Sequence, residues 1–162
     1  MDANDLTTQI EAELLAKGGD LADMPGHLFR ILESRSKALF LSATTAHGVT
    51  PRQFAVLYVL LQRGAMIQAD LAEHTQTDKS TLGEMLKRMA ERGLLVVETG
   101  EDKRSVIVSL TDVGRQIVMD VTPTVIRTQE ALLDPLPEEY RLLFLKCLRI
   151  LVDAEFKVAD EG

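Results

Sequence analysis

Residues 68–111, QADLAEHTQTDKSTLGEMLKRMAERGLLVVETGEDKRSVIVSLT, contain the pattern that decides the fold of this chain. A short amphipathic segment with Leu71 and Ala72 is followed by a polar turn at Gln76-Thr77. A longer segment then places four large apolar side chains at the three- and four-residue spacing of a helix: Leu82, Met85, Leu86 and Met89. Because the small Ala72 suits two helices that cross closely at a tight turn, the pattern predicts a helix-turn-helix.

The rest of the same stretch predicts a β-hairpin. Arg92-Gly93 puts a cation in the last turn of the second helix and a glycine just past its end, as helix C-termini prefer. Two β-rich runs, Leu94–Thr99 and Ser105–Leu110, flank the polar tip Gly100–Arg104. Two helices at a tight turn, followed by a charged two-stranded wing, predict a winged helix-turn-helix, a module that binds DNA.

The hairpin also carries a family signature. The pattern D-x-R followed by V-x-L-T-x-x-G occurs here as Asp102-Lys103-Arg104, Val108, Leu110-Thr111 and Gly114. With Ser80-Thr81 and Glu91–Leu95 in support, the chain resembles the MarR-type transcription regulators over about residues 25–156. The resemblance implies a mainly α fold with a small β-wing (α+β), and a homodimer built from both chain ends. It also implies repression that a ligand relieves, which is the commonest mode in that family.

Composition is compatible with a single domain and with DNA binding by one local surface. A chain of 162 residues with 46% apolar content can bury a real core. The net charge is −7, but residues 50–111 hold eight basic and eight acidic residues, whereas the remainder holds ten against seventeen. DNA binding would therefore depend on a cationic face, for which an ordinary solvated surface is the alternative. The candidates for this face are Lys79, Lys87, Arg88, Lys103 and Arg104.

Several features predict a cytoplasmic protein that contacts no membrane. The longest apolar run, Phe54–Leu61, is far shorter than the ~18 residues of a membrane span. The acidic opening residues 1–15 lack the cationic start of a signal peptide. The single cysteine, Cys147, can form no internal disulfide, and its leucine neighbours predict a buried, inert thiol instead of a redox switch.

Helix-capping residues and prolines divide the remaining chain into helices. Pro25-Gly26 is expected to break the chain before a helix over residues 27–46, and Thr50–Gln53 has the pattern of a capping box. Thr111 is expected to cap a helix that reaches about Leu133 and kinks at Pro123, and the last helix is expected to run from Pro137 to about Phe156. The predicted regions are an N-terminal extension (1–24), a winged helix-turn-helix region (50–111) and a helical dimerisation region (25–49 and 112–162).

The last helix has more apolar surface than one small domain can easily cover. Its large aliphatic residues are Leu142, Leu143, Leu145, Leu148, Leu151 and Val152. A two-fold homodimer would cover them, and C2 dimers are the commonest soluble oligomers; the alternative is packing on the protomer's own domain. Two recognition helices about one DNA turn (~34 Å) apart would then bind a pseudo-palindromic operator.

The first turns of a recognition helix approach base edges, which assigns expected roles. The hydroxyls of Ser80 and Thr81 can contact bases or phosphates, and Gly83 lets the helix come close to DNA. Glu84 can accept a hydrogen bond from cytosine, or it can pair with Lys87 or Arg88 on the helix surface. Many MarR-type regulators carry a basic residue near this position, so the base preference cannot be copied from the family.

The remaining expected DNA contacts are basic. Lys79, Lys87 and Arg88 are candidates for phosphate contacts. Arg104, at the wing tip beside Lys103, is expected to enter a minor groove, and Asp102 is expected to orient its guanidinium.

Arg35 interrupts an apolar stripe and suggests an effector site. Positions 28, 32, 35, 39 and 42 share one helix face, and all are leucine except Arg35 and Ser42. A guanidinium in such a stripe needs an anion, which is either a protein carboxylate or a bound ligand. The family resemblance implies a small aromatic carboxylate, which arginine can hold with two hydrogen bonds. Phe54 and Tyr58 would line the apolar part of that cavity, and Ser42 would add a hydroxyl contact.

Other function classes fit the sequence less well. No phosphate-binding glycine loop, zinc motif or nucleophile elbow is present, so an enzyme is not expected. His27, His47 and His74 lack ligand spacing, and neither a metal nor another cofactor is predicted. An aromatic content of 4% without tryptophan disfavours single-strand binding. The remaining alternative is a winged helix that binds a protein partner without sequence-specific DNA binding.

Overall fold

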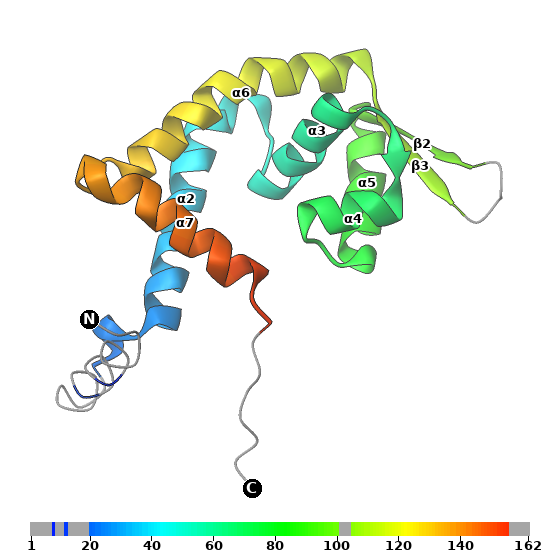
Figure 1. Ribbon diagram of the computed structural model, residues 1–162. Coiled ribbons are helices and arrows are strands. Elements are labelled where there is room, and N and C mark those ends of the chain that lie inside the picture. Colours follow the sequence, from blue (N-terminus) through cyan, green and yellow to red (C-terminus); the bar gives the residue numbers. More distant parts are fainter. Residues whose placement is uncertain (1–7, 9–11, 13–19, 101–104, 156–162) are drawn as a thin grey trace, which may run out of the picture.

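The computed structural model describes residues 8, 12, 20–100 and 105–155 of the chain. Figure 1 shows a long helix, α6, that runs from a compact group of helices and strands, past α2, to the beginning of α7. The elements in chain order are η1 (Leu21–Asp23), α2 (Pro25–Thr44), η2 (Thr45–His47), α3 (Pro51–Arg63), β1 (Met66–Ile67), α4 (Gln68–Thr75), α5 (Lys79–Glu91), β2 (Leu95–Thr99), β3 (Val106–Leu110), α6 (Asp112–Leu133) and α7 (Glu138–Asp153). The predicted fold class, mainly α with a small β-wing, is confirmed.

Helix α3 begins at the predicted capping box. The hydroxyl of Thr50 accepts from the Gln53 backbone N–H at 3.3 Å, and the Gln53 side chain accepts from the Thr50 N–H at 3.1 Å. Both bonds satisfy donors that have no partner inside the helix. Three residues of this helix, Val56, Leu57 and Leu60, are fully buried, which places α3 at the centre of the main core.

The helix-turn-helix forms from α4 and α5 as predicted. The Thr77 N–H donates to the Ala72 carbonyl, and Gln76 adopts a left-handed conformation with φ of 49°. Leu71 and Ala72 are buried on α4, and all four apolar residues expected on α5 are buried against it and the sheet. The tight turn therefore holds α5 with one face in the core and the opposite face exposed.

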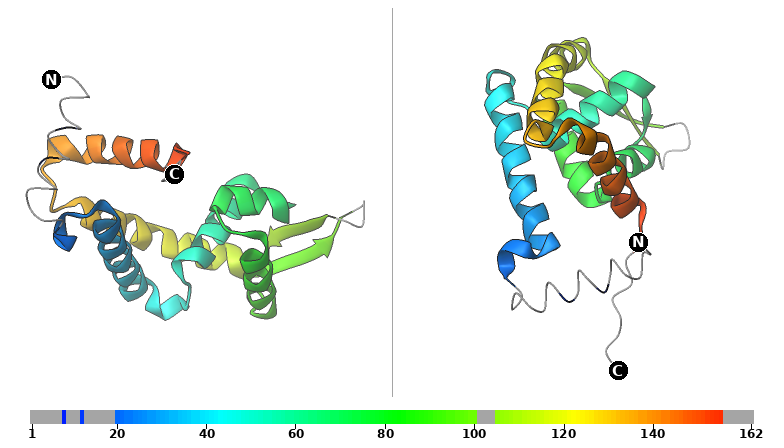
Figure 2. Two further views of the ribbon diagram at one scale, coloured as in Figure 1. Left: turned by 90° about the horizontal axis from the view of Figure 1, so that it is seen from below. Right: turned by 60° about the vertical axis from the view of Figure 1, so that its left-hand side comes forward.

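The sheet has three antiparallel strands in the order β1-β3-β2. Leu95 pairs with Leu110 and Thr99 with Val106, and Met66 of the short β1 strand pairs with Val108 on the other side of β3. Figure 2 shows β2 and β3 extending away from the helices toward the hairpin tip.

A tight joint connects the hairpin to α6. The Thr111 hydroxyl accepts from the Gly114 N–H at 3.0 Å, which caps the helix, and donates to the Gly93 carbonyl at 2.7 Å. The Thr111 N–H donates to the Leu94 carbonyl at 3.2 Å. Gly114 is buried where the first turn of α6 meets that same carbonyl. Helix α6 continues through Pro123 and curves along its length in Figure 1.

A smaller core joins α2 to α6. Phe40 of α2 packs with Val121 and Val125 of α6, and Phe54 of α3 contacts both this cluster and the main core. The buried Thr44 hydroxyl donates toward the carbonyls of Phe40 and Val49, at 2.9 and 3.2 Å, which ties the end of α2 to the following loop. Pro25-Gly26, expected to break the chain, instead forms the first turn of α2, where the missing proline N–H has no cost.

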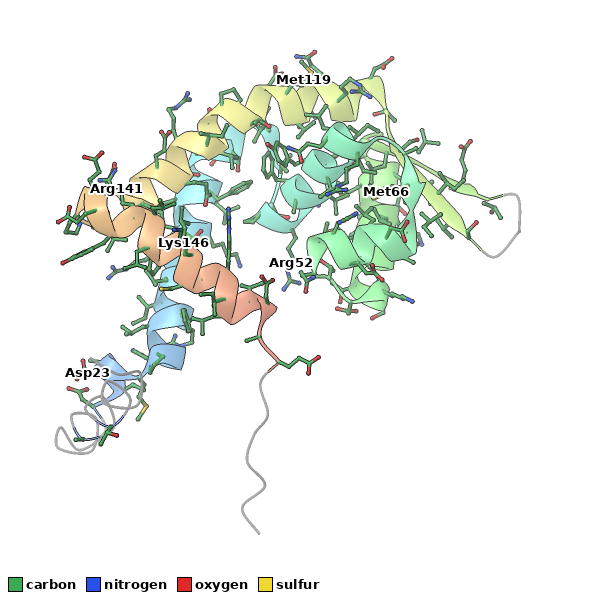
Figure 3. All side chains as sticks on the ribbon, viewed as in Figure 1. Asp23, Arg52, Met66, Met119, Arg141 and Lys146 are labelled. Atoms are coloured by element: carbon green, nitrogen blue, oxygen red, sulfur yellow. The ribbon has the colours of Figure 1, made fainter. Side chains whose placement is uncertain are left out.

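Helix α7 lies apart from the rest of the protomer. Arg141 anchors its start through hydrogen bonds to the carbonyls of Asp134 and Leu136 and an ion pair with the Asp134 carboxylate at 3.4 Å (Figure 3). None of its residues, all of which the structure describes, is buried. Leu142, Ile150 and Val152 are 64%, 69% and 74% exposed.

Two expectations about the last helix are wrong. Cys147 is exposed, because α7 packs closely on no other element of the protomer that would cover its leucine neighbours. The helix ends at Asp153, short of Phe156. No helix among the described residues is long and apolar enough to cross a membrane.

Candidate functional site

The outward face of α5 is polar and accessible. Lys79, Ser80, Glu84, Lys87 and Arg88 are exposed, whereas the opposite face of the helix is buried in the core. A helix supported from behind in this way can present its first turns to a surface outside the protein. These five residues were assigned to DNA contact from the sequence, and the fold places them together on one accessible face.

Asp78 fixes the beginning of that face. One oxygen of its carboxylate accepts from the Thr81 N–H at 2.8 Å, which caps α5, and from the Ser80 hydroxyl at 2.7 Å. Hydrogen bonds from the side chain and backbone of Thr81, and from Ser80, hold the pKa of Asp78 well below its usual range. An ionised carboxylate has no proton to give, so Ser80 must donate its own and keeps only acceptor lone pairs for another partner.

Gly83 faces the side chain of Gln68 on α4. A Cβ at this position would lie 3.3 Å from Nε2 of Gln68 on α4, whose amide also donates to the Lys79 carbonyl at 3.4 Å. A side chain at the half-buried Gly83 would therefore require the end of the Gln68 side chain to move slightly. Its predicted role in approaching DNA stays a prediction.

Of the two expectations for Glu84, pairing with Lys87 or Arg88 is not seen in the structure. No ion pair or hydrogen bond joins Glu84 to Lys87 or Arg88, and all three are among the described residues. The carboxylate is exposed and available to an outside partner. Asp102, Lys103 and Arg104 at the wing tip lie outside the described residues, so their expected contacts stay predictions.

A cavity of about 720 Å³ lies where α2, α3 and α6 meet. Phe40 and Phe54 line it, and their rings are 5.7 Å apart between centroids with an interplanar angle of 60°. Lys37 of α2 and Arg52 of α3 supply cations to its lining, and Glu33 supplies one carboxylate. Apolar rings beside two cations suit a flat organic anion. Sequence periodicity could not place Lys37 and Arg52 together, because they lie on different helices.

Arg35 lines a different cavity. This second cavity has a volume of about 550 Å³, lies between α2, α7 and the end of α6, and is mostly apolar. Arg35 is exposed and has no hydrogen bond or ion pair to any described residue. The lining residues are Phe29, Leu32, Glu33, Arg35, Ser36, Leu39, Ala131, Leu132, Pro135, Leu136, Phe144 and Leu148.

The four residues expected to form one effector site do not meet in either of these two cavities. Phe54 lines the first cavity and stacks on Tyr58 at 5.4 Å between centroids, but Tyr58 itself lines neither of the two. Ser42 also lines neither cavity, and its hydroxyl donates to the Leu39 carbonyl at 2.8 Å within α2. Within the described residues, no three His, Cys, Asp or Glu side chains gather as metal ligands would.

The fold and the exposed helix define a DNA-binding protein of the winged helix-turn-helix class. Residues 47–105 match the model of the MarR family. The chain is 34% identical over 107 residues to the transcriptional regulator HosA of Escherichia coli O111:H-, covering 65% of this chain and 79% of HosA. This chain belongs to the MarR family of transcription regulators.

Two further likenesses span more of the chain. The transcriptional repressor NicR of Pseudomonas putida is 29% identical over 150 residues, which cover 92% of this chain and 95% of NicR. The structure is also similar to that of BpsR from Bordetella bronchiseptica, a protein whose DNA binding is regulated by 6-hydroxynicotinic acid. That similarity has a TM-score of 0.78 and 29% identity, and it covers 83% of this chain and 96% of BpsR.

Proposed function

We propose that this chain is a ligand-responsive repressor that binds a pseudo-palindromic operator as a homodimer and is released by a small aromatic acid. The observation that carries the proposal is the face of α5, polar and accessible over a fully buried apolar face. The major groove of B-DNA, about 12 Å wide, admits such a helix. Membership of the MarR family and the effector of BpsR support the two halves of the proposal.

The dimer is proposed to form through residues 25–49 and 112–162, with residues 50–111 as the reading head and 1–24 as an N-terminal extension. Support comes from apolar side chains that the protomer leaves uncovered at both ends of this region, including Leu28 and Phe29 on α2 and Leu142 and Ile150 on α7. Soluble monomers rarely expose large contiguous apolar patches, and many large apolar side chains exposed on two helices are typical of an interaction surface. A two-fold partner would cover them and set the spacing of the two reading heads.

Within each head, the proposed contacts follow from charge and hydrogen-bonding capacity. Lys87 and Arg88 bind phosphates, and Arg104 enters a minor groove. Ser80, whose proton is committed to Asp78, accepts a hydrogen bond from a base amino group in the major groove. Phosphate oxygens are acceptors only, so the phosphate contact considered for Ser80 from the sequence is the less suitable partner.

DNA binding is tested by fluorescence anisotropy with duplexes from the region upstream of the protein's own coding sequence. We expect a duplex containing a pseudo-palindrome to bind at least a hundredfold more tightly than a scrambled duplex at the same salt concentration. Equal affinity for both duplexes would contradict sequence-specific regulation and would favour a protein-interaction module.

The aromatic acid is proposed to bind in the first cavity, against Phe40 and Phe54, with its carboxylate beside Lys37. The lining of the first cavity supplies two cations and aromatic faces, whereas that of the second cavity supplies one cation. A hydrogen bond to a charged group contributes about 1.5–3 kcal/mol, so Lys37→Gln should weaken binding roughly 10- to 150-fold. The alternative anchor is Arg35 in the second cavity.

Calorimetry with 6-hydroxynicotinic acid and benzoate distinguishes the two cavities. We expect both acids to bind the wild type, and benzamide, which lacks the charge, to bind far more weakly. Lys37→Gln should lose affinity while Arg35→Leu keeps it. The reverse result would move the acid to the second cavity, and no heat with any acid would remove this effector class.

A further inference from the structure

Arg52 borders two separate hollows of the protein. It lines the acid cavity between α2, α3 and α6, and it also lines a cleft of about 270 Å³ beside the turn of the helix-turn-helix. The other wall of this cleft is the segment Thr75–Asp78, which contains the left-handed Gln76 and ends at the cap of α5. Figure 3 shows Arg52 extending from the beginning of α3 toward the helix-turn-helix.

The backbone at Arg52 is fixed, but its side chain is not. Arg52 follows Thr50 and Pro51 in the capped first turn of α3, and the rest of that helix is held in the main core. The side chain is exposed and has no hydrogen bond or ion pair to any described residue. A long, flexible side chain on a rigid base can place its guanidinium on either side without moving α3.

The charges on the two sides differ. In the cleft, Asp78, whose carboxylate is ionised, belongs to the same lining as Arg52. In the cavity, Lys37 opposes it and Glu33 attracts it, so the lining charges nearly cancel. A bound carboxylate would attract the guanidinium into the cavity, since it adds a negative charge to that side alone. The position of the guanidinium would then depend on whether the acid is present.

We propose that Arg52 couples the acid cavity to the recognition helix. Without acid, the negative charge of Asp78 favours the guanidinium on the cleft side, where its positive charge stabilises the segment Thr75–Asp78, from which α5 begins. An aromatic carboxylate in the cavity draws the guanidinium away and leaves that segment unsupported. The operator-binding position of α5 is then less favourable. This inference rests on the proposed function, because it names the residue through which the acid acts.

The test measures the coupling between acid and operator. For wild type and Arg52→Gln, operator affinity is measured by anisotropy without acid and with saturating 6-hydroxynicotinic acid, and acid affinity is measured separately by calorimetry. Allosteric coupling typically changes affinity about 5- to 150-fold. We expect a ratio in that range for the wild type and a ratio below about twofold for Arg52→Gln. The matched control is Arg63→Gln, at the exposed far end of the same helix and in neither lining, which should behave as wild type.

Each outcome decides between distinct possibilities. An Arg52→Gln variant supports the proposal if it binds the acid and if its operator affinity, already lowered without acid to the acid-bound level of the wild type, does not change when acid is added. A variant released as fully as the wild type overturns it, as does one that binds no acid at any concentration, since Arg52 would then be a ligand contact alone. If the wild type itself binds no operator or no acid, the proposed function fails instead. Linkage is reciprocal, so operator DNA should weaken acid binding to the wild type by the same factor and should not weaken binding to Arg52→Gln.

Discussion

Gly114→Ala should disrupt the joint between the hairpin and α6. A Cβ at this position would overlap the carbonyl oxygen of Leu94 and would lie 3.0 Å from its carbonyl carbon and 3.3 Å from its Cα. Carbon atoms in favourable contact lie about 3.5–4.0 Å apart, and here both sides of the contact are backbone. Neither can rotate away, so α6 or the strand must shift.

The cost follows from what that shift breaks. Forcing a methyl group into a filled site costs about 1–3 kcal/mol. Moving the strand also lengthens the two hydrogen bonds from Thr111 to the carbonyls of Gly93 and Leu94, each contributing about 1 kcal/mol. Alanine regains up to about 1 kcal/mol through its helix propensity. The net loss is about 2–4 kcal/mol, which for a chain of this size lowers Tm by about 4–16 °C.

Thermal unfolding followed by circular dichroism measures this loss at one fixed protein concentration, because dimers melt in a concentration-dependent way. Gly26→Ala is the matched control: it lies in the first turn of α2, and an added Cβ would meet nothing within 4 Å. We expect its Tm to stay unchanged or to rise slightly. If Gly114→Ala melted within about 2 °C of the wild type, the joint would be more compliant than its geometry indicates.

Further variants test other parts of the molecule. In anisotropy titrations, Lys87→Ala should lower the slope of log affinity against log salt by about one unit, because it removes a phosphate contact. Arg104→Ala should weaken operator binding by about 1–3 kcal/mol, because it removes a minor-groove contact. Unchanged operator binding in both variants would place the DNA-binding surface elsewhere. Thr44→Val should cost about 1–3 kcal/mol in chemical unfolding, because it removes the hydroxyl bonded to two buried carbonyls. The pKa of Asp78 is lower in the folded protein than in the unfolded chain, so its ionised carboxylate stabilises the fold at pH values above the ordinary carboxyl pKa. The wild type should therefore have a higher Tm than Asp78→Asn at neutral pH, and this difference should shrink as the pH falls below about 4. Removing residues from Pro137 onward should leave a monomer or an aggregate in light scattering; a soluble dimer would place the interface elsewhere.

Most of the fold that was predicted correctly follows from short sequence patterns, namely capping residues and the spacing of apolar residues. The capping box at Thr50, the cap at Thr111 and the apolar spacing in α5 are each set within a few residues, and each forms as expected. The resemblance to the MarR family added the order of the elements. Helix ends were less accurate, as with α7, because fraying depends on tertiary contacts.

The predictions that were wrong, and the features that the sequence did not indicate, depend on contacts between residues distant in sequence. The leucines around Cys147 correctly indicated an apolar face, but burial needs an opposing surface that the protomer does not provide. The stripe containing Arg35 identified one face of α2, while the first cavity lies on another. The packing role of Gly114 follows only from its contact with Leu94, which periodicity cannot reveal.

The length of α6 turns it into a lever arm. Its 22 residues, at about 1.5 Å each, extend roughly 33 Å along the curved helix between the hairpin joint and the start of α7. A tilt of about 6° at one end displaces the other by roughly 3.4 Å, the rise of one base-pair step along a DNA strand. A tilt of α6 beside α7, even one too small to repack a core, would then shift a reading head by one base-pair step along the operator. The stiffness of this helix, as much as any contact with a base, would determine how sharply the regulator responds.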